Sequence, residues 1–243
     1  MLRPPTLIER LADSADVGTA SLQIPGAGML QLQQAPWDEA GTGGMVWPAA
    51  SVLCEWLREN HAGAIRGANI LEVGCGTGAC GLFVAGVGAA RVLMTDGSEE
   101  VLLLADKNIK ANRTAVARCD VRTQRLPWGP RYPPPPGPWN FVLASDCAYT
   151  DERWQALAAT VRKLLQQQPA SPPRVFMSQQ HRTASNSLLS GTFVTTLRAS
   201  GLRAILCQVS RDVHATVPAA DGSLPEHRVT VTVLELKLAE GAG

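Results

Sequence analysis

The sequence predicts an α/β fold in which helices cover both faces of a mostly parallel sheet. From residue 69 onward, short apolar segments alternate with segments that carry apolar residues at helical spacing, the pattern of repeated strand and helix units. The first apolar segment ends in a glycine-rich turn directly before a helical segment, as at the ligand-binding edge of such sheets. The composition is 45% hydrophobic and 18% charged over 243 residues. It is globular, and a chain of this length buries about 70% of its unfolded surface.

The N-terminal part is expected to be an extension, residues 1–36, that carries a small β-hairpin. One main domain over residues 37–243 is expected to follow it. Apolar and polar residues alternate over 21–24 and 29–33, and a Pro-Gly pair lies between the two segments, which predicts two strands and a turn. A glycine-rich linker over 37–45 leads to a helix over 48–60, where Pro48 suits the first helical turn.

The main domain is expected to contain a regular series of strands and helices. Apolar runs predict strands, and apolar residues at a period of about 3.6 predict helices. The strands are expected over residues 70–73, 90–95, 115–121, 140–145 and 174–178, and the helices over 79–87, 98–112, 151–168 and 187–200. Ser98 is expected as the N-cap of its helix. The last two strands, over 202–209 and 228–238, have no helical pattern between them and are expected to pair antiparallel.

Two further segments are expected to be surface loops. Residues 133–138 read Pro-Pro-Pro-Pro-Gly-Pro, which predicts a stiff, polyproline-like insertion. Residues 179–182 read Gln-Gln-His-Arg after the fifth strand. They are expected to form a solvated loop on the same side of the sheet as the glycine turn, with a place at a substrate entrance as the alternative.

Charge and composition exclude several classes of protein. The 22 Lys and Arg residues nearly balance the 21 Asp and Glu residues, for a net charge of +1, so no nucleic-acid partner is expected. Six cysteines without a Cys-x-x-Cys pair indicate free thiols, and the cytoplasm is expected, with the nucleus left open. The four histidines are scattered, so no metal site is expected. Residues 73–90 lack charge but hold six glycines, which argues against a membrane span.

The glycine turn is the segment that carries chemistry. Gly74, Gly76 and Gly78 stand at alternate positions, Glu72 precedes them, and Asp96 ends the next strand 22 residues after Gly74. Glycine lets a ligand approach the backbone closely, and a strand-end acid accepts hydrogen bonds from ribose hydroxyls. The spacing differs from the Gly-x-Gly-x-x-Gly of nicotinamide-binding proteins, and Glu72 would repel a pyrophosphate. S-adenosylmethionine, which has a cationic amino group and no phosphate, fits better than a nicotinamide cofactor.

With these features, the sequence resembles the seven-β-strand S-adenosylmethionine-dependent methyltransferases. It is most similar to their protein-lysine branch, methyltransferase family 16. Four segments carry the narrower resemblance: Met-Val-Trp-Pro-Ala-Ala at 45–50, Leu-Pro-Trp-Gly at 126–129, Ser-Asp-Cys-Ala-Tyr at 145–149, and the helix with Asn108 and Asn112. The resemblance implies a Rossmann-like, doubly wound, seven-stranded sheet, mostly parallel with an antiparallel C-terminal hairpin.

The same resemblance implies a set of residues that bind S-adenosylmethionine. Trp47 is expected over the methionine end of the cofactor, with Glu72 near its amino group and Asp96 on its ribose. Trp128 is expected beside the adenine, with Asp120 left open as another acid near it. The backbone is expected to contribute through Gly74, Cys75, Gly76, Gly78 and Ser145.

The resemblance also implies the residues that face the substrate, Asp146 and Tyr149. A lysine nucleophile must be neutral, and deprotonation at pH 7 costs about 4.6 kcal/mol from a pKa of about 10.4. We expect Asp146 to hold the amine and Tyr149 to line its slot. The expected partner is a protein substrate, with a chaperone or another multiprotein target as one possibility. Methylation of histidine, arginine or a small molecule, and a non-catalytic cofactor-binding scaffold, remain as alternatives.

Overall fold

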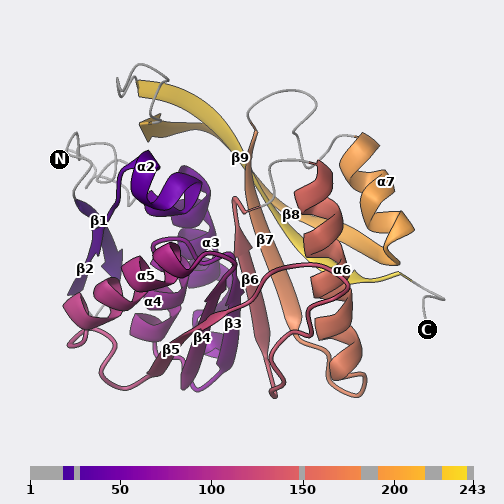
Figure 1. The fold of residues 1–243 in the computed structure, drawn as a ribbon, viewed down its shortest axis with the longest axis horizontal. Coiled ribbons are helices and arrows are strands. Elements are labelled where there is room, and N and C mark those ends of the chain that lie inside the picture. The colour runs from indigo at the N-terminus through magenta and orange to yellow at the C-terminus, as the bar shows by residue number, and fades with distance from the viewer. Residues whose placement is uncertain (1–18, 25–27, 148–150, 182–190, 217–225, 240–243) are drawn as a thin grey trace.

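The computed structural model describes residues 19–24, 28–147, 151–181, 191–216 and 226–239. A seven-stranded sheet runs through the middle of the molecule (Figure 1), in the order β5-β4-β3-β6-β7-β9-β8. Its strands are β3 (Asn69–Val73), β4 (Arg91–Asp96), β5 (Asp120–Arg125), β6 (Phe141–Ser145), β7 (Arg174–His181), β8 (Leu202–Thr216) and β9 (Glu226–Leu238). The first five strands in this order are parallel, and β9 is antiparallel to both β7 and β8. The predicted fold class is confirmed.

Helices cover both faces of this sheet. One face is covered by α3 (Pro48–Ile65), α4 (Ala79–Val87) and α5 (Glu99–Ala111), and the other by α6 (Asp151–Gln167) and α7 (Gly191–Ala199). Short helical turns, α2 (Trp37–Ala40) and η1 (Gly41–Gly44), precede α3. Ser98 caps α5 as predicted, since its Oγ accepts a hydrogen bond from the Val101 N–H at 3.2 Å. Within the described stretches, no helix is both long and apolar enough to cross a membrane.

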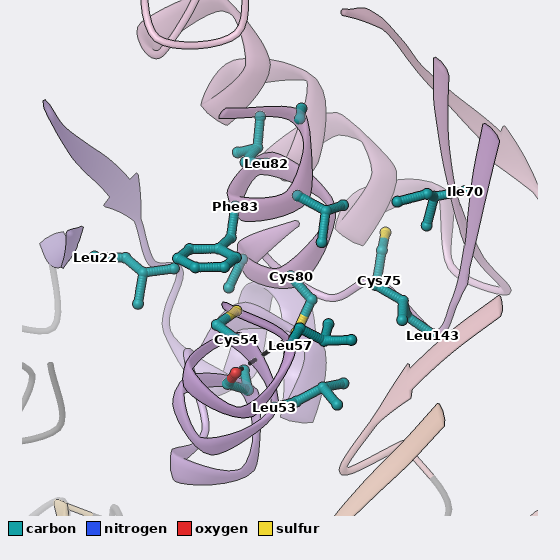
Figure 2. Packing of buried hydrophobic residues seen from close by; sticks show 14 of the residues in the cluster. Leu22, Leu53, Cys54, Leu57, Ile70, Cys75, Cys80, Leu82, Phe83 and Leu143 are labelled. Carbon is teal, nitrogen blue, oxygen red and sulfur yellow. Dashed lines mark hydrogen bonds between the residues drawn. The ribbon is translucent and has the colours of Figure 1, made fainter. Parts of the chain in front are cut away.

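The N-terminal hairpin, β1 (Thr19–Ile24) and β2 (Gly28–Gln33), forms as predicted. Its apolar side chains join the core beside α4 and α5, and the ring of Phe83 points toward Leu22 (Figure 2). Gly86 of α4 makes room for Ile24, because a Cβ at Gly86 would lie 2.1 Å from the Ile24 Cδ1. The division between residues 36 and 37 stays a prediction.

The third strand, predicted over 115–121, is displaced toward the C-terminus and overlaps the prediction only at residues 120 and 121. Residues 112–118 form hydrogen-bonded turns, in which Asn112 O accepts from the Ala115 and Val116 N–H groups. The buried Val116 fills the core from a turn, which explains the apolar signal. The actual strand, β5, begins at Asp120 and is largely exposed and polar, because it lies at the edge of the sheet.

The loop expected over 179–182 was wrong up to His181. Strand β7 continues through this residue because β9 pairs with it, placing Gln179 opposite Thr232 and Gln180 opposite Val231. Both glutamines are buried. Pairing with β9, which is distant in sequence, therefore places the polar residues 179–181 within a strand. Arg182 lies outside the described residues.

The proline-rich segment is less free than expected. Pro134 and Pro135 are buried, and their carbonyl groups accept hydrogen bonds from Gln167 Nε2 at 3.2 Å and Trp139 Nε1 at 3.0 Å. The Arg91 guanidinium lies over the Trp139 ring at 4.9 Å. The segment thus packs onto α6 and the sheet, with only part of it on the surface.

Candidate active site

A cavity of about 580 Å³ opens at the carboxyl ends of β3, β4 and β6, beneath the segment that joins α2 to α3. Nine of the residues predicted for the site line it: Trp47, Glu72, Gly74, Cys75, Gly76, Asp96, Trp128, Ser145 and Asp146. Gly78 stands apart from its lining and starts helix α4, facing Met94. Tyr149 lies outside the described residues. Segments up to 99 residues apart therefore converge on one cavity, at the sheet edge where α/β proteins bind ligands.

The glycine turn follows β3 and forms one wall of this cavity. Gly74 and Gly76 have φ values of +71° and +52°, which side chains other than glycine adopt at a cost. A Cβ at Gly74 would lie 2.7 Å from the Cys147 Cβ and 2.8 Å from the Trp128 Cζ2. The missing side chain at Gly74 therefore lets Trp128 and Cys147 pack directly against the glycine turn.

Asp96 is held in place by backbone groups at the end of β4. Its Oδ2 accepts from the Gly76 N–H at 3.3 Å and its Oδ1 from the Ser98 N–H at 3.1 Å. Burial raises the pKa of this carboxyl. The arrangement fixes an acceptor-rich side chain beside the glycine turn, as hydrogen bonds to ribose hydroxyls require.

Glu72 lies deeper, with 2% of its surface exposed. Its Oε2 accepts a hydrogen bond from the Gly81 N–H of α4 at 2.9 Å. Burial raises the pKa of Glu72 to about 8, although the Gly81 hydrogen bond acts in the opposite direction. A nearby cationic group would stabilise its charged form.

Two tryptophans, Trp47 and Trp128, line the cavity. The Trp47 Nε1 donates to the Thr42 carbonyl at 2.8 Å, which joins the start of α3 to the preceding loop. Trp128 packs against Gly74, and no acceptor in the described part of the chain meets its buried Nε1. A buried indole N–H normally finds a partner, so this nitrogen is suited to a ligand acceptor.

Asp146 follows β6 with an unusual backbone, at a φ of +48°. Its N–H donates to the Ser178 carbonyl at 2.8 Å. Its Oδ1 accepts from Gln179 Nε2 at 2.7 Å and from the Gln180 N–H at 3.2 Å. Beside it, the Ser145 Oγ lies 3.1 Å from the Ser178 Oγ. Strand β7 thus fixes both the backbone and the carboxylate of Asp146.

Several residues of this region had no functional signal in the sequence. The loop of Gly41, Thr42 and Gly43 lines the cavity, but its glycines indicated only a linker. Arg153 of α6 also lines it. Burial raises the pKa of Asp96, and the positive charge of Arg153 opposes this rise. The contact between Gln179 and Asp146 depends on the pairing of β6 with β7, which no local pattern reveals.

Asp120 does not contribute to the cavity lining. Because β5 starts at this residue, Asp120 lies at the opposite end of the strand from the cavity, where it pairs with Arg122 at 2.8 Å. In the described residues, no cluster of His, Cys, Asp and Glu could hold a metal ion. Burial also raises the pKa of the Cys75 and Cys147 thiols, which makes them poor nucleophiles.

Comparison with known proteins agrees with this arrangement. A family model described as lysine methyltransferase matches residues 27–197. Protein N-lysine methyltransferase METTL21A of Danio rerio is 32% identical over 129 residues, which cover 53% of this chain and 58% of that protein. Calmodulin-lysine N-methyltransferase of Arabidopsis thaliana is 29% identical over 132 residues, covering 54% and 43%. The chain thus spans about half the length of these two relatives.

A solved structure is similar in fold. Magnesium protoporphyrin IX methyltransferase from Synechocystis PCC 6803, with bound SAH, superimposes with a TM-score of 0.52 at 13% identity, covering 83% of this chain and 88% of that one. This similarity supports the Rossmann-like architecture. The family model matches most of the chain and includes every described residue of the cavity lining. The chain therefore belongs to the lysine methyltransferase family.

Proposed function

We propose that this protein is an S-adenosylmethionine-dependent protein N-methyltransferase that methylates a lysine side chain of a protein substrate. The observation that carries the proposal is the single cavity in which the glycine turn, two tryptophans and the carboxylates of Glu72, Asp96 and Asp146 converge. Three carboxylates around one cavity suit a cationic cofactor and a cationic acceptor.

The residues of the cavity fit S-adenosylmethionine. Gly74 lets the Trp128 ring pack against the glycine turn, and the Trp128 Nε1 is buried without an acceptor among the described residues. We assign Asp96 to the ribose hydroxyls, Glu72 to the amino group and Trp128 to the adenine. Trp47 would cover the methionine end. The backbone of Gly74, Cys75, Gly76 and Ser145 would contact the cofactor, and Gly78 would act by starting α4.

When bound, S-adenosylmethionine supplies a methyl group on a sulfonium, which is already a good leaving group. The chain's own residues then have two tasks, to align the acceptor nitrogen and to exclude water. Asp146 would hold the substrate amine at the end of β6, beside the cavity. A lysine must lose its proton before it reacts, and desolvation in a closed slot lowers its pKa. The proton would leave through water.

Tyr149 is proposed to line the amine slot. The relative named for calmodulin supports a protein as substrate, and a chaperone or another multiprotein target belongs to the same proposal. We place the protein in a reducing compartment, the cytoplasm or also the nucleus. The support for this is that all six cysteines are free.

Calorimetric titration tests the cofactor. The wild type should bind S-adenosylmethionine with a Kd of about micromolar strength, since several hydrogen bonds and charge pairs contribute, and it should not bind NAD. Asp96→Ala should lose this binding, because its ribose acceptors are gone. Binding of NAD instead, or equal binding by the variant, would contradict the assignment.

Methyl transfer tests the activity. Tritiated S-adenosylmethionine is added to a soluble cell extract with the purified protein, and the labelled residues are identified by mass spectrometry. Methyl-lysine is expected with the wild type and not with Asp146→Ala, whose cofactor Kd should be nearly unchanged. Label on histidine, arginine or a small molecule would contradict lysine as the acceptor. Cofactor binding without transfer to any acceptor would indicate a scaffold.

A further inference from the structure

The side chain of Gln179 contacts Asp146 from the neighbouring strand. The Gln179 Nε2 donates to Asp146 Oδ1 at 2.7 Å, and the Gln180 N–H donates to the same oxygen at 3.2 Å. The Asp146 backbone is tied to Ser178 O at 2.8 Å. Three consecutive residues of β7 therefore fix Asp146. Ser178 and Gln180 do so through their backbone, and Gln179 does so through its side chain.

Packing does not explain an amide at this position. Gln179 is fully buried, with 0% of its surface exposed. Its Oε1 has no hydrogen-bond donor within the described part of the chain. A buried polar atom without a partner destabilises a fold. An apolar side chain of similar volume, such as methionine, would fill the same space without this cost. The Nε2 of the same amide donates to the buried Asp146 carboxylate, so the contact with Asp146 accounts for an amide at this position.

From this geometry we propose that Gln179 is a positioning residue for methyl transfer, which acts by orienting the Asp146 carboxylate toward the acceptor amine. The inference rests on the proposed function. Two donors on Oδ1 restrict rotation of the carboxylate about its Cβ–Cγ bond. A neutral amide does this without cancelling the negative charge, whereas Lys or Arg would pair with it.

The central variant is Gln179→Met, which keeps the volume and removes the donor. Thr232→Val is the matched control. Thr232 lies directly opposite Gln179 on β9, is fully buried, and makes a hydrogen bond of 2.7 Å with His181 Nε2. Each change removes one side-chain hydrogen bond at the same level of the sheet, a buried one at Gln179 and a partly buried one at Thr232. Only the first removes a contact with Asp146.

The assay measures the initial rate of methyl-lysine formation in the soluble extract, with saturating S-adenosylmethionine. Gln179→Met should reduce this rate by about tenfold or more, because small displacements of a positioning group cost about that much or more. Its cofactor Kd should change less than about twofold, since the cofactor contacts of the cavity stay in place. In an Asp146→Asn background, Gln179→Met should have no further effect. Thr232→Val should lower Tm and leave the rate unchanged.

A pH profile of Gln179→Glu tests the same contact with a variant that keeps a polar side chain of similar size. In Gln179→Glu the new carboxyl can donate to Asp146 only while it is protonated. The ratio of variant rate to wild-type rate should therefore fall as pH rises, which a general loss of stability would not produce at temperatures well below Tm.

The outcomes separate the two proposals. A wild-type rate in Gln179→Met, or an equal further loss in the Asp146→Asn background, overturns the role of Gln179 alone. A wild type that forms no methyl-lysine overturns the proposed function, and the role of Gln179 with it. A rate loss in Thr232→Val as large as in Gln179→Met assigns the effect to packing and also overturns the inference.

Discussion

The side-chain amide of Asn108 in α5 makes two hydrogen bonds with the backbone of Gln33 in the N-terminal hairpin, 75 residues away in the chain. The Gln33 N–H donates to Asn108 Oδ1 at 2.7 Å, and Asn108 Nδ2 donates to Gln33 O at 3.0 Å. The same Nδ2 donates to the Thr77 carbonyl of the glycine turn at 2.9 Å. The buried side-chain amide of Asn108 therefore joins the edge of the hairpin to the glycine turn.

This contact predicts that the hairpin and the cofactor site are coupled. Asn108→Asp keeps the shape of the side chain but faces two carbonyl oxygens with a carboxylate. It should lower the free energy of unfolding by about 2–4 kcal/mol, as two buried acceptors lose their donor. Because one of these is Thr77 O, cofactor affinity should fall as well. Denaturant unfolding and calorimetry measure the two effects.

Asn112 provides the control for this prediction. It holds Gln31 in the same way, with distances of 2.8 Å to the N–H and 2.8 Å to the carbonyl, and its Nδ2 also donates to Asn108 O. Within the described residues, its side chain makes no hydrogen bond with the glycine turn. Asn112→Asp should cost similar stability with a smaller change in Kd. Equal losses of affinity in the two variants would argue against a specific path through Thr77.

Gly74→Ala should displace Trp128 in the wall of the cavity. The new Cβ would lie 2.7 Å from Cys147 Cβ and 2.8 Å from Trp128 Cζ2, so the indole must move. Gly67→Ala is matched in backbone, with φ of +75° against +71°, and has no atom within 4 Å of the new Cβ. Gly67→Ala should cost about 1–2 kcal/mol of stability. Gly74→Ala should cost more and lose at least about tenfold in cofactor affinity, or 1.4 kcal/mol. Equal Kd values in both variants would place the cofactor elsewhere.

Glu72 should make stability depend on pH. Its pKa is about 8 in the folded protein against an ordinary value of 4.5. Between these values the unfolded chain has released a proton that the folded chain keeps, so stability falls as pH rises through this window. Glu72→Gln removes the titration. Its Tm should exceed that of the wild type by more at about pH 8 than at about pH 5. A difference that is constant over this range would show that Glu72 does not titrate there.

Trp139→Phe should loosen the proline-rich segment. It removes the hydrogen bond from Nε1 to the Pro135 carbonyl and weakens the contact with Arg91. We expect a loss of about 1–2 kcal/mol in unfolding free energy. The cofactor Kd should be unchanged, since Trp139 is not among the residues that line the cavity. A weakened Kd would mean that this segment supports the site.

The elements that the sequence predicted correctly depend on local signals. The helix over 79–87 has its predicted bounds, because apolar spacing and a flanking glycine at each end define it. The strands β3, β4 and β6 were predicted within a residue or two because buried parallel strands are continuous apolar runs. In contrast, β5 is polar and at an edge, and its neighbour β4 alone makes it a strand.

The sequence by itself determined the order of most elements and the family, and it predicted nine residues that line the cavity, since these are carried by short motifs whose chemistry is local. Only the tertiary structure decided what surrounds Asp146. Residues 179 and 180 are polar and follow an apolar run, which is typical of a strand that has ended. The pairing of β7 with β9 buried them, and its pairing with β6 placed an amide 2.7 Å from a carboxylate. Contacts between strands depend on register across the whole sheet, a non-local property that no spacing along the chain encodes.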